Sequence, residues 1–135
     1  MEYYLSKLKE NGYKITAKRC EILELFLLKE KYLSPEEIRE ELIRQFPRVS
    51  LPSIYRNLED MESIGILTRI IRPDRRLYYA LCRVKNNRHH HHIVCLKCGR
   101  IGEMERCGMF DIKVINGFRI TGHYLQLEGL CRKCR

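Results

Sequence analysis

Apolar residues in the first half of the chain recur every three or four positions, which is the spacing that gives a helix one buried face. Each run begins at a residue that can cap a helix, or ends at a glycine or proline that stops one. The pattern predicts four helices: at residues 3–12, after Thr16, at residues 34–46 and at residues 50–65. Cys20 lies on the apolar face of the second helix, so we expect it in the core.

The hydrophobic period then shortens to about two residues, as in a strand. Residues 66–72 and 77–81 alternate in this way, and Pro73-Asp74-Arg75-Arg76 between them predicts a hairpin turn. Helices followed by a basic hairpin are typical of a winged helix-turn-helix, whose last helix before the hairpin enters the major groove of DNA. We therefore expect residues 1–82 to form a winged-helix DNA-binding domain.

Polar residues on the exposed side of the fourth helix, and basic residues around it, are the candidate DNA contacts. Hydroxyl, amide and guanidinium groups are the usual partners of bases and phosphates. The candidates are Lys14, Arg19, Ser53, Tyr55, Arg56, Asn57, Arg75 and Arg76. The alternative is that Tyr55 packs at the edge of the core and the arginines only solvate an ordinary hairpin.

The composition of the 135 residues is that of a globular protein, with 44% hydrophobic and 32% charged residues. No apolar run approaches the roughly 18 residues of a membrane span, and the N-terminus lacks the pattern of a secretory signal. We therefore expect a cytoplasmic protein without a membrane partner. In that compartment, seven cysteines indicate metal ligands or reactive thiols before disulfides.

The net charge of +9 is concentrated in the second half of the chain. Residues 1–81 hold 15 Lys and Arg against 13 Asp and Glu, whereas residues 82–135 hold 11 against 4. Four thiolates around one Zn²⁺ would remove two charges from that excess (−4 + 2). Net charge alone therefore does not identify a DNA-binding protein.

The composition changes after Cys82. Residues 83–88 are polar and basic and predict a linker, while residues 89–135 are rich in His, Cys and Gly with short strand-like runs, including residues 124–127. A unit of this size buries too little apolar surface to fold on its core alone. It therefore needs a metal or disulfides to hold it.

Two Cys-x₂-Cys pairs supply such a support: Cys95 with Cys98, and Cys131 with Cys134. Each pair brings two sulfurs to one side of a tight turn, and two pairs complete the tetrahedral S₄ site of a structural zinc. The competing readings are two disulfides, a thioredoxin-like redox pair and an iron–sulfur cluster. A reducing compartment disfavours disulfides, and a thioredoxin-like pair would need a strand before the motif and a helix after it. Iron–sulfur clusters usually have a different cysteine spacing.

Four consecutive histidines, His89 to His92, precede the first pair. If they continue into a strand, alternation sends His89 and His91 to one face and His90 and His92 to the other. The expected ligands of one site are Cys82, His90, His92 and Glu103. Those of the other are His89, His91 and His123, with Glu105 or Asp111 as an acidic ligand. The alternative is a loop that only tolerates histidines, and Cys107, beside Gly108, is expected to be an exposed thiol without a role.

Five segments resemble, in order and spacing, the ferric uptake regulator (Fur) family of metal-responsive bacterial repressors. They are NGYKITAKRCEIL, SPEEIREEL, LPSIYRNLEDMESIGIL, HHHHIVCLKCGRIGEME and GHYLQLEGLCRKC. The resemblance implies an α+β fold, in which an N-terminal winged helix precedes a small C-terminal α/β dimerisation domain at residues 89–135. It also implies a structural zinc in the four-cysteine set, a regulatory ion at the hinge between the domains, and a homodimer on palindromic double-stranded DNA.

Iron-sensing members of that family usually carry His where this chain has Tyr32 and Glu where it has Ala80, and peroxide-sensing members usually carry Asp at the position of Glu103. Zinc uptake regulators (Zur) resemble this chain more, with a Cys matching Cys82 and a His matching His91. The resemblance therefore favours a zinc sensor that represses metal-uptake genes, with Fe²⁺ or Mn²⁺ as the alternative ion.

Two features depart from the zinc regulators. The linker between Cys82 and His89 is longer, and the segment between Glu103 and His123 is shorter, which abbreviates the helix that usually supplies an acidic ligand. Two alternatives are an iron- or peroxide-sensing member and a DNA-binding module with structural zinc only. We expect no enzymatic activity and no small-molecule substrate. The chain has neither a His-Glu-x-x-His pair nor the His-x-Glu followed by Pro-Cys-x-x-Cys that base deaminases carry.

Overall fold

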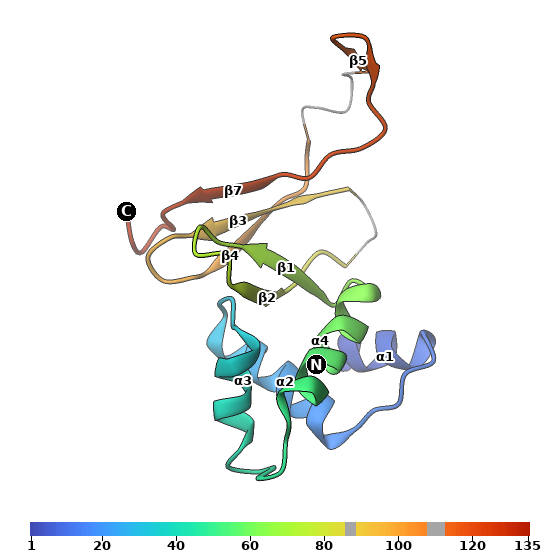
Figure 1. The fold of residues 1–135 in the computed structure, drawn as a ribbon, viewed down its shortest axis with the longest axis vertical. Helices are drawn as coiled ribbons and strands as arrows, with labels where there is room; N and C mark the ends of the chain where they lie inside the picture. The colour runs from blue at the N-terminus through green and yellow to red at the C-terminus, as the bar shows by residue number, and fades with distance from the viewer. Residues whose placement is uncertain (86–88, 108–112) are drawn as a thin grey trace. The chain divides into compact units, whose positions relative to one another are not determined.

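The computed structural model describes residues 1–85, 89–107 and 113–135. The chain divides into two compact units, Met1–Arg83 and Val84–Arg135, and Figure 1 labels most of the elements of both. Residues 86–88 of the expected linker lie outside the described residues. None of the helices that the structure describes is both long and apolar enough to cross a membrane.

The first unit contains the four predicted helices: α1 (Glu2–Glu10), α2 (Ala17–Lys29), α3 (Pro35–Leu42) and α4 (Leu51–Ser63). The side chains of Thr16, Ser34 and Ser50 cap the last three by accepting a hydrogen bond from the backbone N–H three residues on. Helix α3 ends at Leu42, earlier than the apolar pattern predicts. Residues 43–45 form a turn, with Phe46 N–H donating to the carbonyl of Leu42 at 2.8 Å, and Phe46 packs against the core directly after it.

The predicted hairpin follows directly, with strands β1 (Leu67–Ile71) and β2 (Leu77–Leu81) paired in antiparallel register from Leu67↔Leu81 to Ile71↔Leu77. At its turn, Arg75 takes a left-handed φ of 61°. Leu33 extends the hairpin by exchanging two backbone hydrogen bonds with Tyr79, at 2.8 and 2.9 Å. Helices and a hairpin in this order form a winged helix.

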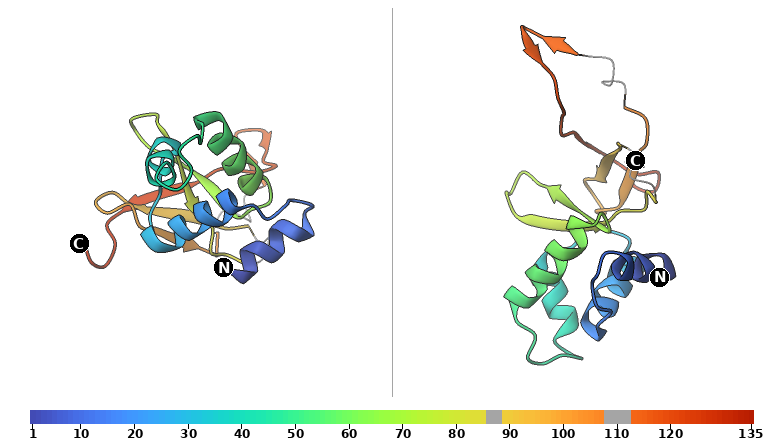
Figure 2. Two further views of the ribbon diagram at one scale, coloured as in Figure 1. Left: turned by 90° about the horizontal axis from the view of Figure 1, so that it is seen from below. Right: turned by 90° about the vertical axis from the view of Figure 1, so that its right-hand side faces the viewer.

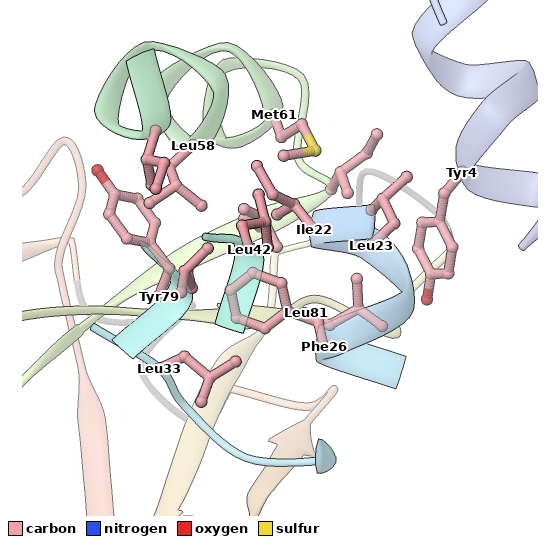
Figure 3. Packing of buried hydrophobic residues seen from close by; sticks show 14 of the residues in the cluster. Tyr4, Ile22, Leu23, Phe26, Leu33, Leu42, Leu58, Met61, Tyr79 and Leu81 are labelled. Carbon is pink, nitrogen blue, oxygen red and sulfur yellow. The ribbon is translucent and has the colours of Figure 1, made fainter. Parts of the chain in front are cut away.

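Large apolar side chains from the helices and the hairpin fill one core in the first unit. Figure 3 shows Ile22, Phe26 and Tyr79 among these side chains, and all three are at most 1% exposed. Figure 2 shows helices α2, α3 and α4 side by side, with the hairpin at one end of them. Cys20 is only half-buried, so it lies at the margin of this core and not inside it.

The second unit is built from short strands. β3 (His91–Cys95) lies in the middle of a three-stranded sheet, antiparallel to β4 (Ile101–Met104) and parallel to β7 (Gln126–Gly129). β5 (Val114–Ile115) and β6 (Phe118–Arg119) form a separate hairpin. Among described residues 84–85, 89–107 and 113–135 there is no helix, so the α/β character expected of this unit reduces there to strands.

Candidate metal centres and DNA-binding face

Strand β3 distributes the histidine run over both faces of its sheet. His91 and His92 begin the strand, and His89 and His90 precede it directly. The alternation expected from the sequence is present. The rings of His90 and His92 lie together with centroids 4.8 Å apart, while those of His89 and His91 lie together at 4.5 Å. One run of four residues therefore offers imidazoles to two separate places.

The two Cys-x₂-Cys pairs meet, as predicted, at the end of the three-stranded sheet. Each pair spans a tight turn, in which Gly99 N–H donates to the carbonyl of Cys95 and Cys134 N–H donates to that of Cys131. Cys98 Sγ and Cys131 Sγ lie 3.6 Å apart. This is close to the ~3.8 Å edge of a tetrahedron with Zn–S bonds of about 2.3 Å. The four sulfurs thus form one cluster of the right size for zinc.

The electrostatics of this cluster favour a bound dication. Backbone N–H groups of Cys98 and Cys131 point at Cys95 Sγ and lower the pKa of the Cys95 thiol to about 5. The hydrogen bond with Cys131, followed by burial, favours the protonated thiol of Cys134 and raises its pKa to about 12. Four thiolates in one place therefore require a compensating ion, and the donor set fits structural Zn²⁺.

A second cluster forms on the face of β3 that carries His89 and His91. His123, from the segment before β7, joins them, and the three Nε2 atoms lie 2.9 to 3.0 Å apart in every pairing. Burial, followed by the charges of His89 and His123, lowers the pKa of His91. The structure thus brings together the three histidines that the sequence predicted for one site.

The fourth member of this cluster is Cys107, which the sequence analysis missed. Its Sγ lies 3.2 Å from Nε2 of both His91 and His123, and the residue is 9% exposed. The expectation that Cys107 is an exposed thiol is therefore wrong, since the chain after β4 turns its side chain inward. Of the two acids expected here, Glu105 is exposed and lies outside the cluster, and Asp111 lies outside the described residues.

The opposite face of β3 carries His90 and His92 of the other predicted set, whereas Glu103 lies outside the group of ligand atoms that the structure brings within 4.8 Å of one another. Glu103 lies directly across from His92 in the register of β3 and β4. Nε2 of His92 is buried and has no hydrogen-bond partner in the part of the chain that the structure describes. Burial, followed by the charges of His90 and His91, lowers the pKa of His92 to about 4, so its ring is neutral near pH 7. Cys82 directly follows β2 and belongs to the first unit.

Of the predicted DNA-contact residues on helix α4, Ser53, Tyr55 and Asn57 are half-buried and lie beside its buried stripe of Ile54, Leu58 and Met61. Arg56 is exposed. Asn57 donates its amide to the carbonyl of Ser53 at 3.0 Å, and Tyr55 hydrogen-bonds the carboxylate of Glu36 on α3. Burial, followed by this carboxylate, raises the pKa of Tyr55.

The basic candidates outside α4 divide into exposed and engaged side chains. Lys14, Arg75 and Arg76 are exposed. Arg19 is engaged: its guanidinium bonds Asp60 on α4 at 2.8 Å and the carbonyl of Lys14 at 2.8 Å. Its side chain is 12% exposed, so this arginine supports the position of α4 from inside the unit.

Known proteins resemble this chain in sequence and in architecture. The family model described as the ferric uptake regulator family matches residues 10–128. A ferric uptake regulation protein of Neisseria meningitidis is 35% identical over 136 residues, covering 97% of this chain and 92% of that protein.

Two solved structures agree with this result. The Vibrio cholerae ferric uptake regulator is 30% identical, with a TM-score of 0.60 over 94% of this chain and 98% of that one. A zinc uptake regulator complexed with zinc and DNA shares the fold with a TM-score of 0.75 at 22% identity, over 93% of this chain and 86% of that one. The chain belongs to the ferric uptake regulator family.

Proposed function

We propose that this protein is a homodimeric repressor that binds a palindromic DNA operator when its regulatory site holds zinc. Family membership makes it a metal-responsive transcription regulator. The proposal adds the identity of the ion, the ligands that hold it and the surface that meets DNA.

The observation that carries the choice of zinc is the donor chemistry. The neutral imidazole of His92 lies beside that of His90, and across the strands from Glu103. Cys82 adds a thiolate to this set. Mixed nitrogen, sulfur and oxygen donors in a four-coordinate shell suit Zn²⁺ better than harder ions, which prefer more oxygen ligands.

The positions that carry iron ligands in other family members offer none here. The ring of Tyr32 packs edge-on against that of Tyr78 at 4.8 Å, and the guanidinium of Arg72 lies 5.7 Å from its centroid. Tyr32 is thus part of an aromatic contact, and Ala80 lies within β2 without a ligating side chain. Both features support the choice of zinc over iron.

The mechanism follows from where the proposed ligands sit in the chain. Cys82, His90, His92 and Glu103 would hold the zinc ion, which would link their side chains. Cys82 N–H donates to the carbonyl of Ile66 at 2.9 Å, so Cys82 is held in place relative to the hairpin. Bound zinc would therefore tie the hairpin and α4 to the sheet that carries the histidines and would fix the spacing of the two α4 helices in the dimer.

The dimer surface belongs to the second unit, which leaves large apolar side chains exposed. They include Val114, Ile115, Phe118, Tyr124, Leu127 and Leu130. A second copy of the chain can bury them, and the strand β7 at the edge of its sheet lies in the same unit. A two-fold dimer then presents two α4 helices to half-sites about one helical turn, ~34 Å, apart.

A second candidate is an iron-responsive repressor. It is favoured by the 35% identical relative, which is named a ferric uptake regulation protein. The two candidates differ in which ion restores DNA binding after chelation, so one titration separates them.

The test measures operator binding by fluorescence anisotropy, using a palindromic duplex selected from a random pool in the presence of zinc. We expect zinc to restore binding to chelated protein at a lower free concentration than Fe²⁺ or Mn²⁺. His90→Ala and Cys82→Ser should abolish this response, whereas Cys20→Ser, a control thiol outside every cluster, should retain it. Restoration by Fe²⁺ alone would favour the iron candidate, and binding that ignores chelation would refute both.

A further inference from the structure

We propose that Cys107 takes the place of the expected acid as the fourth ligand of the second histidine cluster, which gives a His₃Cys site that prefers Zn²⁺ to Fe²⁺ and Mn²⁺ and ties Cys107 and His123 to β3. Its other ligands are His89, His91 and His123. This inference goes beyond the proposed function, because it assigns a role to a side chain outside both the four-cysteine set and the regulatory set.

The distances between the donor atoms are slightly shorter than those of a tetrahedral zinc shell. The three Nε2 atoms form a triangle with sides of 2.9 to 3.0 Å, and Cys107 Sγ lies 3.2 Å from two of its corners. A tetrahedral zinc with Zn–N bonds of about 2.05 Å and a Zn–S bond of about 2.3 Å separates its ligands by about 3.3 to 3.6 Å. The four side chains therefore converge on one point.

Hydrogen bonding among neutral imidazoles does not account for this triangle. Each Nε2 either carries a proton and donates or lacks one and accepts. In a triangle of three such atoms, at least one side must join two donors or two acceptors. A cation at the centre removes the conflict, because every Nε2 can then present its lone pair inward.

The surroundings orient the cluster for this purpose. The ring of His91 also hydrogen-bonds the backbone of Leu125, which is the kind of outer support that fixes the tautomer and direction of a ligating histidine. His91 is 4% exposed and Cys107 is 9% exposed, so both donors are shielded from water. Glu105, the nearest acid in the described sequence, stays exposed and leaves the fourth position to sulfur.

The sulfur ligand sets the metal preference. Three imidazoles and one thiolate are borderline to soft donors in a closed four-coordinate set, which suits Zn²⁺ and Co²⁺. Fe²⁺ and Mn²⁺ bind better where carboxylates and water complete a larger shell. The same site with an acid in place of Cys107 would accept these harder ions more readily.

The chain topology gives the centre a structural consequence. Cys107 and His123 bracket the segment that carries the β5–β6 hairpin, and His89 and His91 lie on the central strand of the sheet. An ion shared by all four side chains would therefore anchor Cys107 and His123 to β3. The exposed Val114 and Phe118 lie on the hairpin between these two anchored residues.

The test loads Co²⁺ into the full-length protein in a Cys82→Ser background, with zinc retained in the four-cysteine set and verified by elemental analysis. Cys107 is then the one cluster thiolate left to bind cobalt. We expect tetrahedral d–d bands together with a sulfur-to-cobalt charge-transfer band. Cys107→Asp should lose the charge-transfer band and weaken zinc binding at least about tenfold. It should also reduce the ratio of the zinc affinity to the affinities for Fe²⁺ and Mn²⁺.

Two controls keep the outcome interpretable. Cys20→Ser should leave every band unchanged, and circular dichroism verifies that Cys107→Asp is folded. A charge-transfer band that survives Cys107→Asp would overturn the proposal, as would the absence of a second bound ion in the Cys82→Ser protein. Neither result bears on zinc-dependent DNA binding, which is measured with Cys82 intact, so the two proposals can fail separately.

Discussion

Arg19 and Arg56 both look like DNA contacts in the sequence, yet the structure predicts opposite consequences for their loss. Arg19→Ala removes a charge-assisted hydrogen bond to Asp60 and a second bond to the carbonyl of Lys14, both at 2.8 Å. It also removes a guanidinium that lies 5.3 Å from the ring centroid of Tyr13. Arg56 lies exposed on α4.

The magnitude follows from the burial of the pair. Hydrogen bonds to charged groups contribute about 1.5–3 kcal/mol. The side chains of Arg19 and Asp60 are 12% and 28% exposed, so solvent screens the ion pair only in part, and we take the lower half of that range. Adding the bond to the backbone carbonyl, we expect Arg19→Ala to lower the free energy of unfolding by about 2 kcal/mol. Arg56→Ala should change it by less than about 0.5 kcal/mol.

Urea denaturation followed by helical circular dichroism measures this difference, because all helices that the structure describes belong to the first unit. A double-mutant cycle with Asp60→Ala should give a coupling of about 1 kcal/mol. Operator affinity at saturating zinc should fall in Arg56→Ala and remain near that of the parent protein in folded Arg19→Ala. If Arg19→Ala instead kept the parental urea midpoint and lost affinity as Arg56→Ala does, then Arg19 would be a phosphate contact and the structural argument would be wrong.

Three further predictions concern the cap of α4, the four-cysteine cluster and the hairpin. Ser50→Ala should lower the free energy of unfolding by about 1 kcal/mol in the same urea assay, because the hydroxyl accepts from Ser53 N–H at 3.3 Å. An unchanged midpoint would show that this cap does not stabilise α4. Cys131→Ser should cost one zinc per chain by elemental analysis and expose backbone amides of β3 and β7 to hydrogen exchange, whereas retained zinc would contradict the assignment. Arg76→Ala should reduce the slope of log affinity against log salt concentration by about one, and an unaltered slope would place Arg76 away from phosphate.

Local signals in the sequence were sufficient for the first unit. Capping residues at Thr16, Ser34 and Ser50 each act within one helical turn, and the structure confirms all three. The change of period at residue 66 located the hairpin for the same reason, since alternation is set by neighbouring residues. The end of α3 was misplaced because the apolar pattern includes Phe46, which packs against the core although the regular helix ends at Leu42 and residues 43–45 form a turn.

Contacts between distant segments were less predictable. The strand expected at residues 124–127 is found at Gln126–Gly129, because its position is set by pairing with β3 and not by its own composition. Cys107 was placed on the surface because of its neighbour Gly108, while its inward direction depends on histidines 16 residues away on either side. One signal could have found it. Three imidazoles require a fourth donor, and Cys107 is the one cysteine of residues 89–135 outside the two Cys-x₂-Cys pairs.

Alternation along β3 is what allows a run of four histidines to serve two sites. Successive side chains of a strand point to opposite faces, so a shift of one residue would exchange the two sets. Such a shift is opposed from both sides, because β3 pairs with β4 along one edge and with β7 along the other. The register that places Glu103 opposite His92 is therefore the same register that turns His91 toward His123. If both clusters bind metal as proposed, one substitution, such as a different residue at Cys107, should change the metal preference of one face while the ligands on the other face keep their positions.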